Sequence, residues 1–435
     1  MIVMNRLRRV IFYSLLCLLV THVLSAEVRR SFSFTDAEIS FGFPENTAVR
    51  KEYRAVFGGD PMLLRRTKSR VVEVPGEDYR VKVSVAEQNR AVYLLFINER
   101  NYSFPLYSKG TYIIKSDEVS GEIIQIKIFI KTEKGSFIRV FPDGDRSRMD
   151  VYLYGHPLYR GVFIPVPVTS LTIAPFSKIV AETENIVNWD IIFPEVQDSG
   201  YETIISMTET VRRLLPGMPD AEDGAMNRNG EFVFIDTEQP MGNAGFNCSG
   251  FAKWLVDGLV YPITENCIDI GSLKLKNVED RGNRWSQRYE SARDPYFGLD
   301  WTRNLAAELE KVRHGGKVKS DFADVRNVPF FRYTDDVGFP SEHLQLILYL
   351  LAIREPGYFY LASVNERSTA SPNLRHHFHV AAIFPHFTPS GKFKAPVFER
   401  NFESTIQSFS ERYPGGFVHL VRVPGLRTFE PPNIE

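Results

Sequence analysis

Cys248 follows a turn-prone stretch at residues 245–247 and precedes a largely apolar segment, 249–258, that predicts an amphipathic helix. A thiol in the first turn of a helix lies near the positive end of the helix dipole and near unpaired backbone N–H groups, and both favour the thiolate. Because the thiolate is the nucleophilic form, this position predicts covalent catalysis by Cys248. A buried structural cysteine is the alternative, since free cysteine is among the most buried residue types.

A histidine-rich segment further along the chain supplies a candidate base. In a strand, His377 and His379 would share one face, and a histidine flanked by small residues can approach the end of a helix. There it could accept the thiol proton and later donate a proton to a leaving amine. A zinc site formed from His376, His377, His379 and His386 is the alternative, because His-x-His on one strand face is a ligand geometry. No further ligand set accompanies these histidines, so we expect neither a metal nor a cofactor.

These two segments, in this order, resemble the NlpC-type cell-wall cysteine peptidases. Asn-Cys-Ser-Gly-Phe-Ala at 247–252 is similar to the family's Asp-Cys-Ser-Gly-Phe-Val signature. His-Val-Ala-Ala-Ile at 379–383 is similar to its His-Val-Gly-Ile-Tyr strand, and 356–362 resembles the strand that precedes it. The resemblance covers about residues 200–435. It implies a papain-like α+β fold with an antiparallel sheet.

Carried over position by position, the resemblance implies that Cys248 is the nucleophile and His379 the general base. The Cys248 backbone N–H would contribute to the oxyanion hole. The family's third, polar residue comes from the next strand, where Glu399 is the residue we expect. A carboxylate there would hold the imidazole tautomer and stabilise its charged form. Asn401 and His386 are alternatives for this role, and Glu399 would then be a surface carboxylate.

The sequence also departs from the family pattern. Asn247 replaces the usual Asp, and Phe232 and Phe234 occupy the stretch where the family has a Tyr. The separation between Cys248 and the histidine is longer than is typical. We therefore expect residues 259–340 to be an insertion that forms a lid or reshapes the specificity pocket. Its two tryptophans would line a sugar-binding groove or pack the insertion's own core.

The N-terminus has the features of a secretory signal peptide. Three arginines precede an apolar run at 10–20, and small residues suitable for cleavage follow at 24–26. Residues 1–26 are therefore expected to be removed, which implies a periplasmic or secreted protein without a membrane span. A lipoprotein anchored through Cys17 is an alternative. After cleavage Cys248 and Cys267 remain, and a disulfide between them is the competing prediction in an exported protein.

Length and patterning predict two domains. The chain has 435 residues, of which 43% are hydrophobic, enough for two ordinary cores. Residues 27–195 show short alternating strands between turns, which predicts an all-β sandwich. Residues 196–435 mix helices and strands, which predicts the α+β NlpC-like domain. The β-rich domain has no catalytic constellation, so we expect it to bind or position the protein at the envelope.

Together these features predict an exported cysteine hydrolase that cleaves amide bonds in cell-wall peptides. A thiol acyltransferase or an amidase with a non-wall substrate would use the same residues. A non-catalytic envelope binding or scaffold protein is the third possibility. The net charge of −1, from 52 basic and 53 acidic residues, gives no indication of a nucleic-acid partner.

Overall fold

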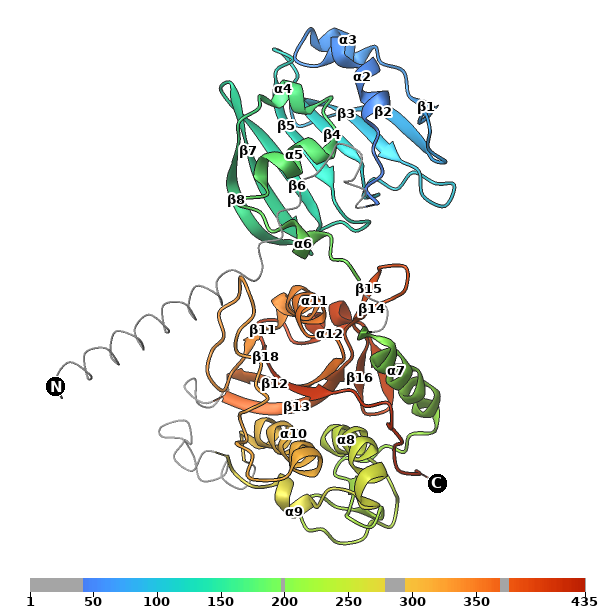
Figure 1. Ribbon diagram of the computed structural model, residues 1–435, viewed down its shortest axis with the longest axis vertical. Coiled ribbons are helices and arrows are strands. Elements are labelled where there is room, and N and C mark those ends of the chain that lie inside the picture. The colour runs from blue at the N-terminus through green and yellow to red at the C-terminus, as the bar shows by residue number, and fades with distance from the viewer. Residues whose placement is uncertain (1–41, 197–199, 278–293, 368–374, 435) are drawn as a thin grey trace, which may run out of the picture.

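A computed structural model describes residues 42–196, 200–277, 294–367 and 375–434 of the chain (Figure 1). The predicted signal peptide, residues 1–26, lies outside the described residues. None of the helices formed by the described residues is long and apolar enough to cross a membrane. The chain forms two regions, each built on an antiparallel sheet, so the structure is a mixed α/β, multidomain one.

The N-terminal region contains one eight-stranded antiparallel meander whose strands lie in chain order. The strands are β1 (Arg70–Glu73), β2 (Arg80–Gln88), β3 (Ala91–Asn98), β4 (Tyr112–Asp117), β5 (Ile123–Phe129), β6 (Phe137–Asp143), β7 (Arg146–Leu153) and β8 (His156–Ile164). Alternate residues are buried along them, most regularly in β4. One face of the sheet is therefore packed and the other is only partly covered.

Short helices cover the packed face. They are α2 (Thr47–Glu52), η1 (Arg54–Val56), α3 (Pro61–Arg65), α4 (Val168–Leu171), α5 (Phe176–Thr183) and α6 (Trp189–Ile192). Leu171, Phe176 and Trp189 join the strands' apolar residues in one core. The predicted all-β sandwich is therefore wrong, because helices take the place of a second sheet. Strand alternation shows that one face is buried, but it does not say whether a sheet or helices cover that face.

The C-terminal region contains a six-stranded antiparallel sheet in the order β11-β18-β12-β13-β16-β17. These strands are β11 (Phe339–Pro340), β12 (Tyr358–Arg367), β13 (Arg375–Ile383), β16 (Val397–Glu399), β17 (Phe402–Ser404) and β18 (Phe417–Pro424). The short pairs β9 (Ala225–Met226) with β10 (Phe232–Val233), and β14 (His386–Phe387) with β15 (Phe393–Lys394), lie beside it. The predicted α+β region with an antiparallel sheet is confirmed.

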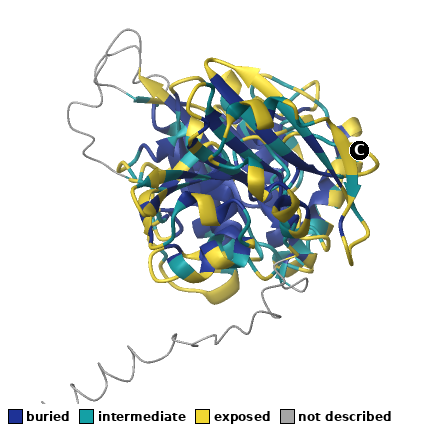
Figure 2. Ribbon diagram, turned by 90° about the horizontal axis from the view of Figure 1, so that it is seen from above, coloured by how far each residue is buried: buried dark blue, intermediate teal, exposed yellow. Residues whose placement is uncertain are grey.

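Helices pack on both faces of this sheet. They are α7 (Glu202–Leu214), η3 (Leu215–Gly217), α8 (Cys248–Thr264), α9 (Ile270–Leu273), α10 (Phe297–His314), η5 (Ser341–His343), α11 (Leu344–Arg354) and α12 (Ile406–Arg412). Leu361 of β12 packs with α8 and α10, whereas its neighbours Tyr360 and Ala362 pack with α11. The strands β12, β13, β16 and β18 thus each contribute to two cores. Figure 2 shows the buried residues gathered in the middle of the molecule and the exposed ones around its rim.

Helix α10 comes from the segment that the sequence treats as an insertion, yet it belongs to the main core. It packs against α8, β12, β13 and β18. The Trp301 side chain is fully buried, and its indole N–H donates to the Ser249 carbonyl over 2.9 Å. A Cβ on Gly298 would lie 2.9 Å from the His377 carbonyl oxygen, so this position favours glycine. At least this part of the segment therefore supports α8 rather than forming a detached lid.

Candidate active site

The start of α8 fixes the position of Cys248. Asn247 is the N-cap residue, and its side-chain oxygen accepts the backbone N–H of Gly250 over 2.8 Å. A Cβ on Gly250 would lie 1.9 Å from the Gly224 carbonyl oxygen, so the first turn of α8 can approach the preceding chain only because residue 250 is glycine. The cap and this close approach place Cys248, the first residue of the helix, at a defined point.

An irregularity in β13 separates the two histidines that simple alternation would place on one face. His379 pairs with Val364 and His377 pairs with Asn365, so one residue on β13 has no counterpart on β12. Neighbouring residues of β12 face opposite sides of the sheet. The Nδ1 atom of His377 consequently lies 2.9 Å from the Ser363 hydroxyl, on the face of the sheet that α10 covers. The prediction that His377 and His379 share a face is wrong for this reason.

His379 contacts both other residues of the predicted triad. Its Nε2 lies 2.8 Å from Oε2 of Glu399. The ring is also close enough to hydrogen-bond the Cys248 thiol. Because Nε2 contacts Glu399, Nδ1 is the ring nitrogen of His379 that is available to the Cys248 thiol. The structure therefore brings Cys248 and Glu399 together at the His379 ring.

Glu399 is buried at the end of β16, with only 1% of its surface exposed. Its two oxygens have separate partners, since Oε2 faces His379 whereas Oε1 accepts from the Ser404 hydroxyl over 2.9 Å and pairs with the Arg412 guanidinium. The alternative that Glu399 is a surface carboxylate is wrong. A carboxylate held on both oxygens in this way has little freedom to rotate, so it can fix the imidazole.

The alternatives for the third residue lie elsewhere. Asn401 is exposed in the turn between β16 and β17. His386, in β14, directs Nδ1 to the Phe384 carbonyl oxygen at 2.9 Å. Burial is the main cause that lowers the pKa of His386. Neither position takes the place of Glu399 beside His379.

The electrostatics of the three side chains favour a charged form of the pair. Burial alone would raise the pKa of the Cys248 thiol, but the hydrogen bond and charge of His379, aided by the backbone N–H of Val380, lower it below the ordinary value. Burial would lower the pKa of His379, but Cys248 and Glu399 raise it to about 9. Against the effect of burial, His379, Ser404 and Arg412 lower the pKa of Glu399. The arrangement stabilises a thiolate beside an imidazolium.

Three residues around the triad were not found from the sequence. Arg412 and Ser404 hold Glu399, as described above, and the Tyr413 ring lies 5.8 Å from the His379 ring, centroid to centroid. Tyr413 directly follows α12, and the two other residues lie at the ends of short elements. No motif marks them, because their role follows from the burial of Glu399, which the sequence pattern does not show.

The second cysteine is separate from this site. Cys248 and Cys267 are both free, so the alternative of a disulfide between them is wrong. Burial, followed by the charge of Asp257, raises the pKa of Cys267 to about 12. This thiol is therefore unreactive at neutral pH. As to a zinc site at the histidines, the described residues contain no group of three His, Cys, Asp or Glu side chains that could hold a metal ion.

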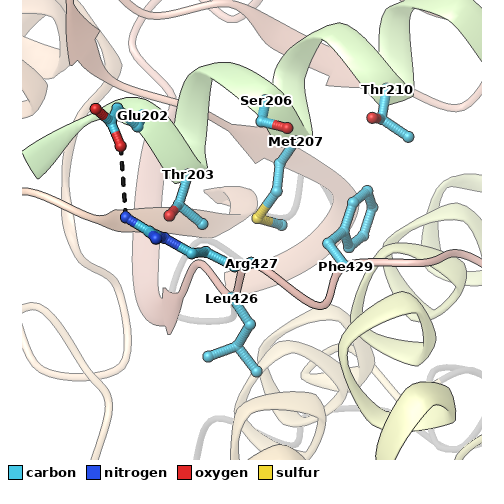
Figure 3. A pocket seen from close by; sticks show the side chains of 8 residues that line it. All are labelled: Glu202, Thr203, Ser206, Met207, Thr210, Leu426, Arg427 and Phe429. Carbon is cyan, nitrogen blue, oxygen red and sulfur yellow. Dashed lines mark hydrogen bonds and ion pairs between the residues drawn. The ribbon is translucent and has the colours of Figure 1, made fainter. Parts of the chain in front are cut away.

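A cavity of about 170 Å³ lies between α7 and the C-terminal segment (Figure 3). Glu202 and Arg427 form an ion pair of 3.4 Å across its edge. The full lining is Glu202, Thr203, Ser206, Met207, Thr210, Leu426, Arg427 and Phe429. None of these residues belongs to the triad, so the cavity is separate from the candidate active site.

Comparison with known proteins bears on the N-terminal region alone. A family model described as "Domain of unknown function (DUF8515)" matches residues 39–191. This range contains all eight strands of the meander and most of the helices that cover it. No curated protein matches the chain significantly, and no solved structure does.

Proposed function

We propose that the protein is an exported cysteine hydrolase that cleaves amide bonds in cell-wall peptides, with Cys248 as nucleophile, His379 as general acid and base, and Glu399 as the residue that orients His379. The observation that carries the proposal is that His379 interacts with both Cys248 and the buried Glu399. Each further contact supports it, because the helix start favours the thiolate and the buried carboxylate favours the imidazolium.

The proposed reaction proceeds in two halves. The Cys248 thiolate attacks the carbonyl carbon, and the negative charge on the carbonyl oxygen meets backbone N–H groups at the start of α8. The imidazolium of His379 protonates the leaving amine, the C–N bond breaks, and a thioester remains on Cys248. Neutral His379 then removes a proton from water as it attacks the thioester, which releases the carboxylic acid and restores the thiolate and imidazolium. No cofactor enters these steps.

The substrate class rests on the NlpC-type resemblance and on the predicted signal peptide. The six-stranded antiparallel sheet, with a cysteine-bearing helix packed against the histidine-bearing strand, is compatible with a papain-like domain. The order of the elements, Cys-helix before β12 and β13, also agrees with that family. We therefore place the cell-wall peptide ahead of other amides.

Digestion of purified peptidoglycan by the full chain tests the proposal. We expect soluble peptides to be released by the wild type and not by Cys248→Ala. The matched control is Cys267→Ala, which removes the other free thiol and should leave the release of peptides intact. Equal release by the wild type and Cys248→Ala would rule the proposal out.

The competing chemistries give different products. If an added amine acceptor is incorporated in place of water, the enzyme is a thiol acyltransferase. If wall peptides are untouched while another amide is cleaved in a manner that requires Cys248, the enzyme is an amidase with a different substrate. An unreactive thiol at every pH below 8.5 would identify the non-catalytic scaffold.

A further inference from the structure

The face of the N-terminal sheet opposite the helices carries basic and aromatic side chains side by side. Lys127 of β5 lies directly opposite Arg139 of β6. In the neighbouring row Phe129, Phe137 and Tyr152 lie next to one another on β5, β6 and β7. We call these five residues the basic–aromatic face. Lys127, Arg139 and Tyr152 are half-buried, whereas the two phenylalanines are buried beneath the cations.

The aromatic rings hold the cations in place. The Lys127 ammonium lies 3.7 Å from the centroid of the Phe137 ring and 4.7 Å from that of Phe129. The Arg139 guanidinium lies 5.1 Å from the ring centroids of Phe137 and of Tyr152. Such contacts orient a cation without neutralising it. The positive charges of this face are therefore preorganised and remain available.

This arrangement disfavours the folded protein unless something else compensates for it. Like charges directly opposite each other on neighbouring strands are destabilising. Burial and the repulsion from Arg139 both lower the pKa of Lys127. No carboxylate of the described residues forms an ion pair with either side chain. Asp150, the carboxylate opposite Arg139, accepts the backbone N–H of Gly161 over 2.8 Å instead. A surplus of positive charge thus sits on a chain whose net charge is −1.

We propose that the basic–aromatic face binds the carboxylates of cell-wall glycopeptide and so holds the enzyme on its polymeric substrate, an inference that rests on the proposed function. Charge complementarity supports this partner, because wall peptides carry free carboxylates. The basic–aromatic face crosses β5, β6 and β7. Lys115 of β4 lies over the Tyr93 ring of β3 and continues the pattern. From β3 to β7 the distance across the sheet is about 19 Å. A single-stranded nucleic acid fits less well, because its bases need free rings for stacking and the Phe137 ring is already covered.

Co-sedimentation with purified peptidoglycan sacculi tests this binding. The full chain carries Cys248→Ala so that the wall stays intact. We expect Lys127→Glu and Arg139→Glu, each made alone, to weaken binding about tenfold. Raised salt should likewise weaken the binding of the Cys248→Ala chain that has no second substitution. The matched control is Lys51→Glu, which reverses an exposed charge on α2, against the opposite face of the sheet.

Stability provides the second measurement. Lys127→Glu replaces the repulsion from Arg139 by attraction but loses the contacts of the cation with the Phe137 and Phe129 rings, so we expect the melting temperature to stay within about 2 °C while binding falls. Loss of binding therefore cannot be attributed to misfolding. Unchanged sacculus binding in both variants would overturn the inference. So would charge-dependent binding of poly-uridine RNA or anionic vesicles in its place, or dimerisation that the same substitutions abolish.

The inference and the proposed function fail separately. Sacculus binding is measured on a chain without the Cys248 thiol, so it does not depend on hydrolysis. Conversely, we expect Lys127→Glu to cleave a soluble wall peptide at the wild-type rate, because the substitution is in the other region of the molecule. A chain that binds sacculi but releases nothing would contradict only the hydrolase.

Discussion

In the proposed mechanism, the charge state of Cys248 and His379 sets the pH range of activity. Below the lowered pKa of Cys248 the thiol is protonated and cannot attack. As the pH rises through about 9, the His379 imidazolium loses its proton and no longer protonates the leaving amine. We therefore expect kcat/KM to be bell-shaped in pH, with its alkaline limb near pH 9 and its acid limb below the ordinary thiol range. Labelling of Cys248 by a thiol reagent should begin below pH 8.5; a single midpoint near 8.5 would contradict this assignment.

The raised pKa of His379 also makes the stability of the folded protein depend on pH. The folded pKa of His379 is raised, so its contribution is fully present below the unfolded value of about 6.5 and is lost as the pH rises through about 9. Glu399→Gln removes one of the causes of that raised pKa. We expect this variant to shift the alkaline limb of kcat/KM to lower pH, and an unshifted limb would show that Glu399 does not act on His379.

Arg412 contacts Glu399, and the proposed mechanism makes it a positioning residue for that carboxylate. Arg412→Met would leave a buried carboxylate with only Ser404 and His379, which favours its protonated form. We expect kcat to fall about tenfold with KM unchanged and the alkaline limb to move to lower pH, with partial rescue in Arg412→Lys. Arg212→Met is the matched control, since Arg212 pairs with the more exposed Glu403 at 2.6 Å. Equal kinetics in the two methionine variants would refute this role.

At the scale of elements, the close approach of α8 to the preceding chain depends on Gly250. Gly250→Ala would force a Cβ against the Gly224 carbonyl, so α8 must shift and Cys248 must move with it. We expect a loss of about 3 kcal/mol in the free energy of unfolding, and slower thiol labelling in the chains that still fold. Gly217→Ala is the control, because a Cβ there meets nothing within 4 Å, and its effect should stay within about 0.5 kcal/mol. Equal destabilisation by the two substitutions would contradict the argument.

The elements also show how far the sequence predicts this molecule. The turn before Cys248 and the apolar run after it predict the helix start, and the order of segments locates the strands bearing His379 and Glu399. The irregularity in β13 could not be predicted, because it depends on pairing with β12. Arg412 could not be predicted either, because a cation is required beside Glu399 only once that carboxylate is buried. The helices over the N-terminal sheet were missed because alternation in the strands does not identify the covering layer.

At the scale of the whole molecule, the turn between β7 and β8 contacts the C-terminal region. Leu153 and Leu158, on either side of the turn, are part of the core that includes α11. The Tyr154 ring lies 5.2 Å from the Tyr349 ring, and the Tyr349 hydroxyl donates to the Ile191 carbonyl over 2.8 Å. The two regions therefore share apolar packing and are expected to unfold together.

Tyr154 occupies this interface in a strained conformation. Its φ is 50°, in a region that residues other than glycine and asparagine rarely adopt. Asn adopts this backbone conformation more readily than Tyr, so Tyr154→Asn relieves the strain in the turn. It also removes the ring that contacts Tyr349. We therefore expect the two regions to uncouple, so that one calorimetric transition becomes two, while cleavage of a soluble wall peptide persists.

Tyr102→Asn is the matched control for this uncoupling. Tyr102 has a φ of 60° and is 94% exposed, so its substitution relieves the same strain without touching the interface. It should raise stability by about 0.5 kcal/mol and leave a single transition. If Tyr154→Asn behaved in the same way, the ring at Tyr154 would not couple the regions, and the apolar contacts of Leu153 and Leu158 would have to carry the interface alone.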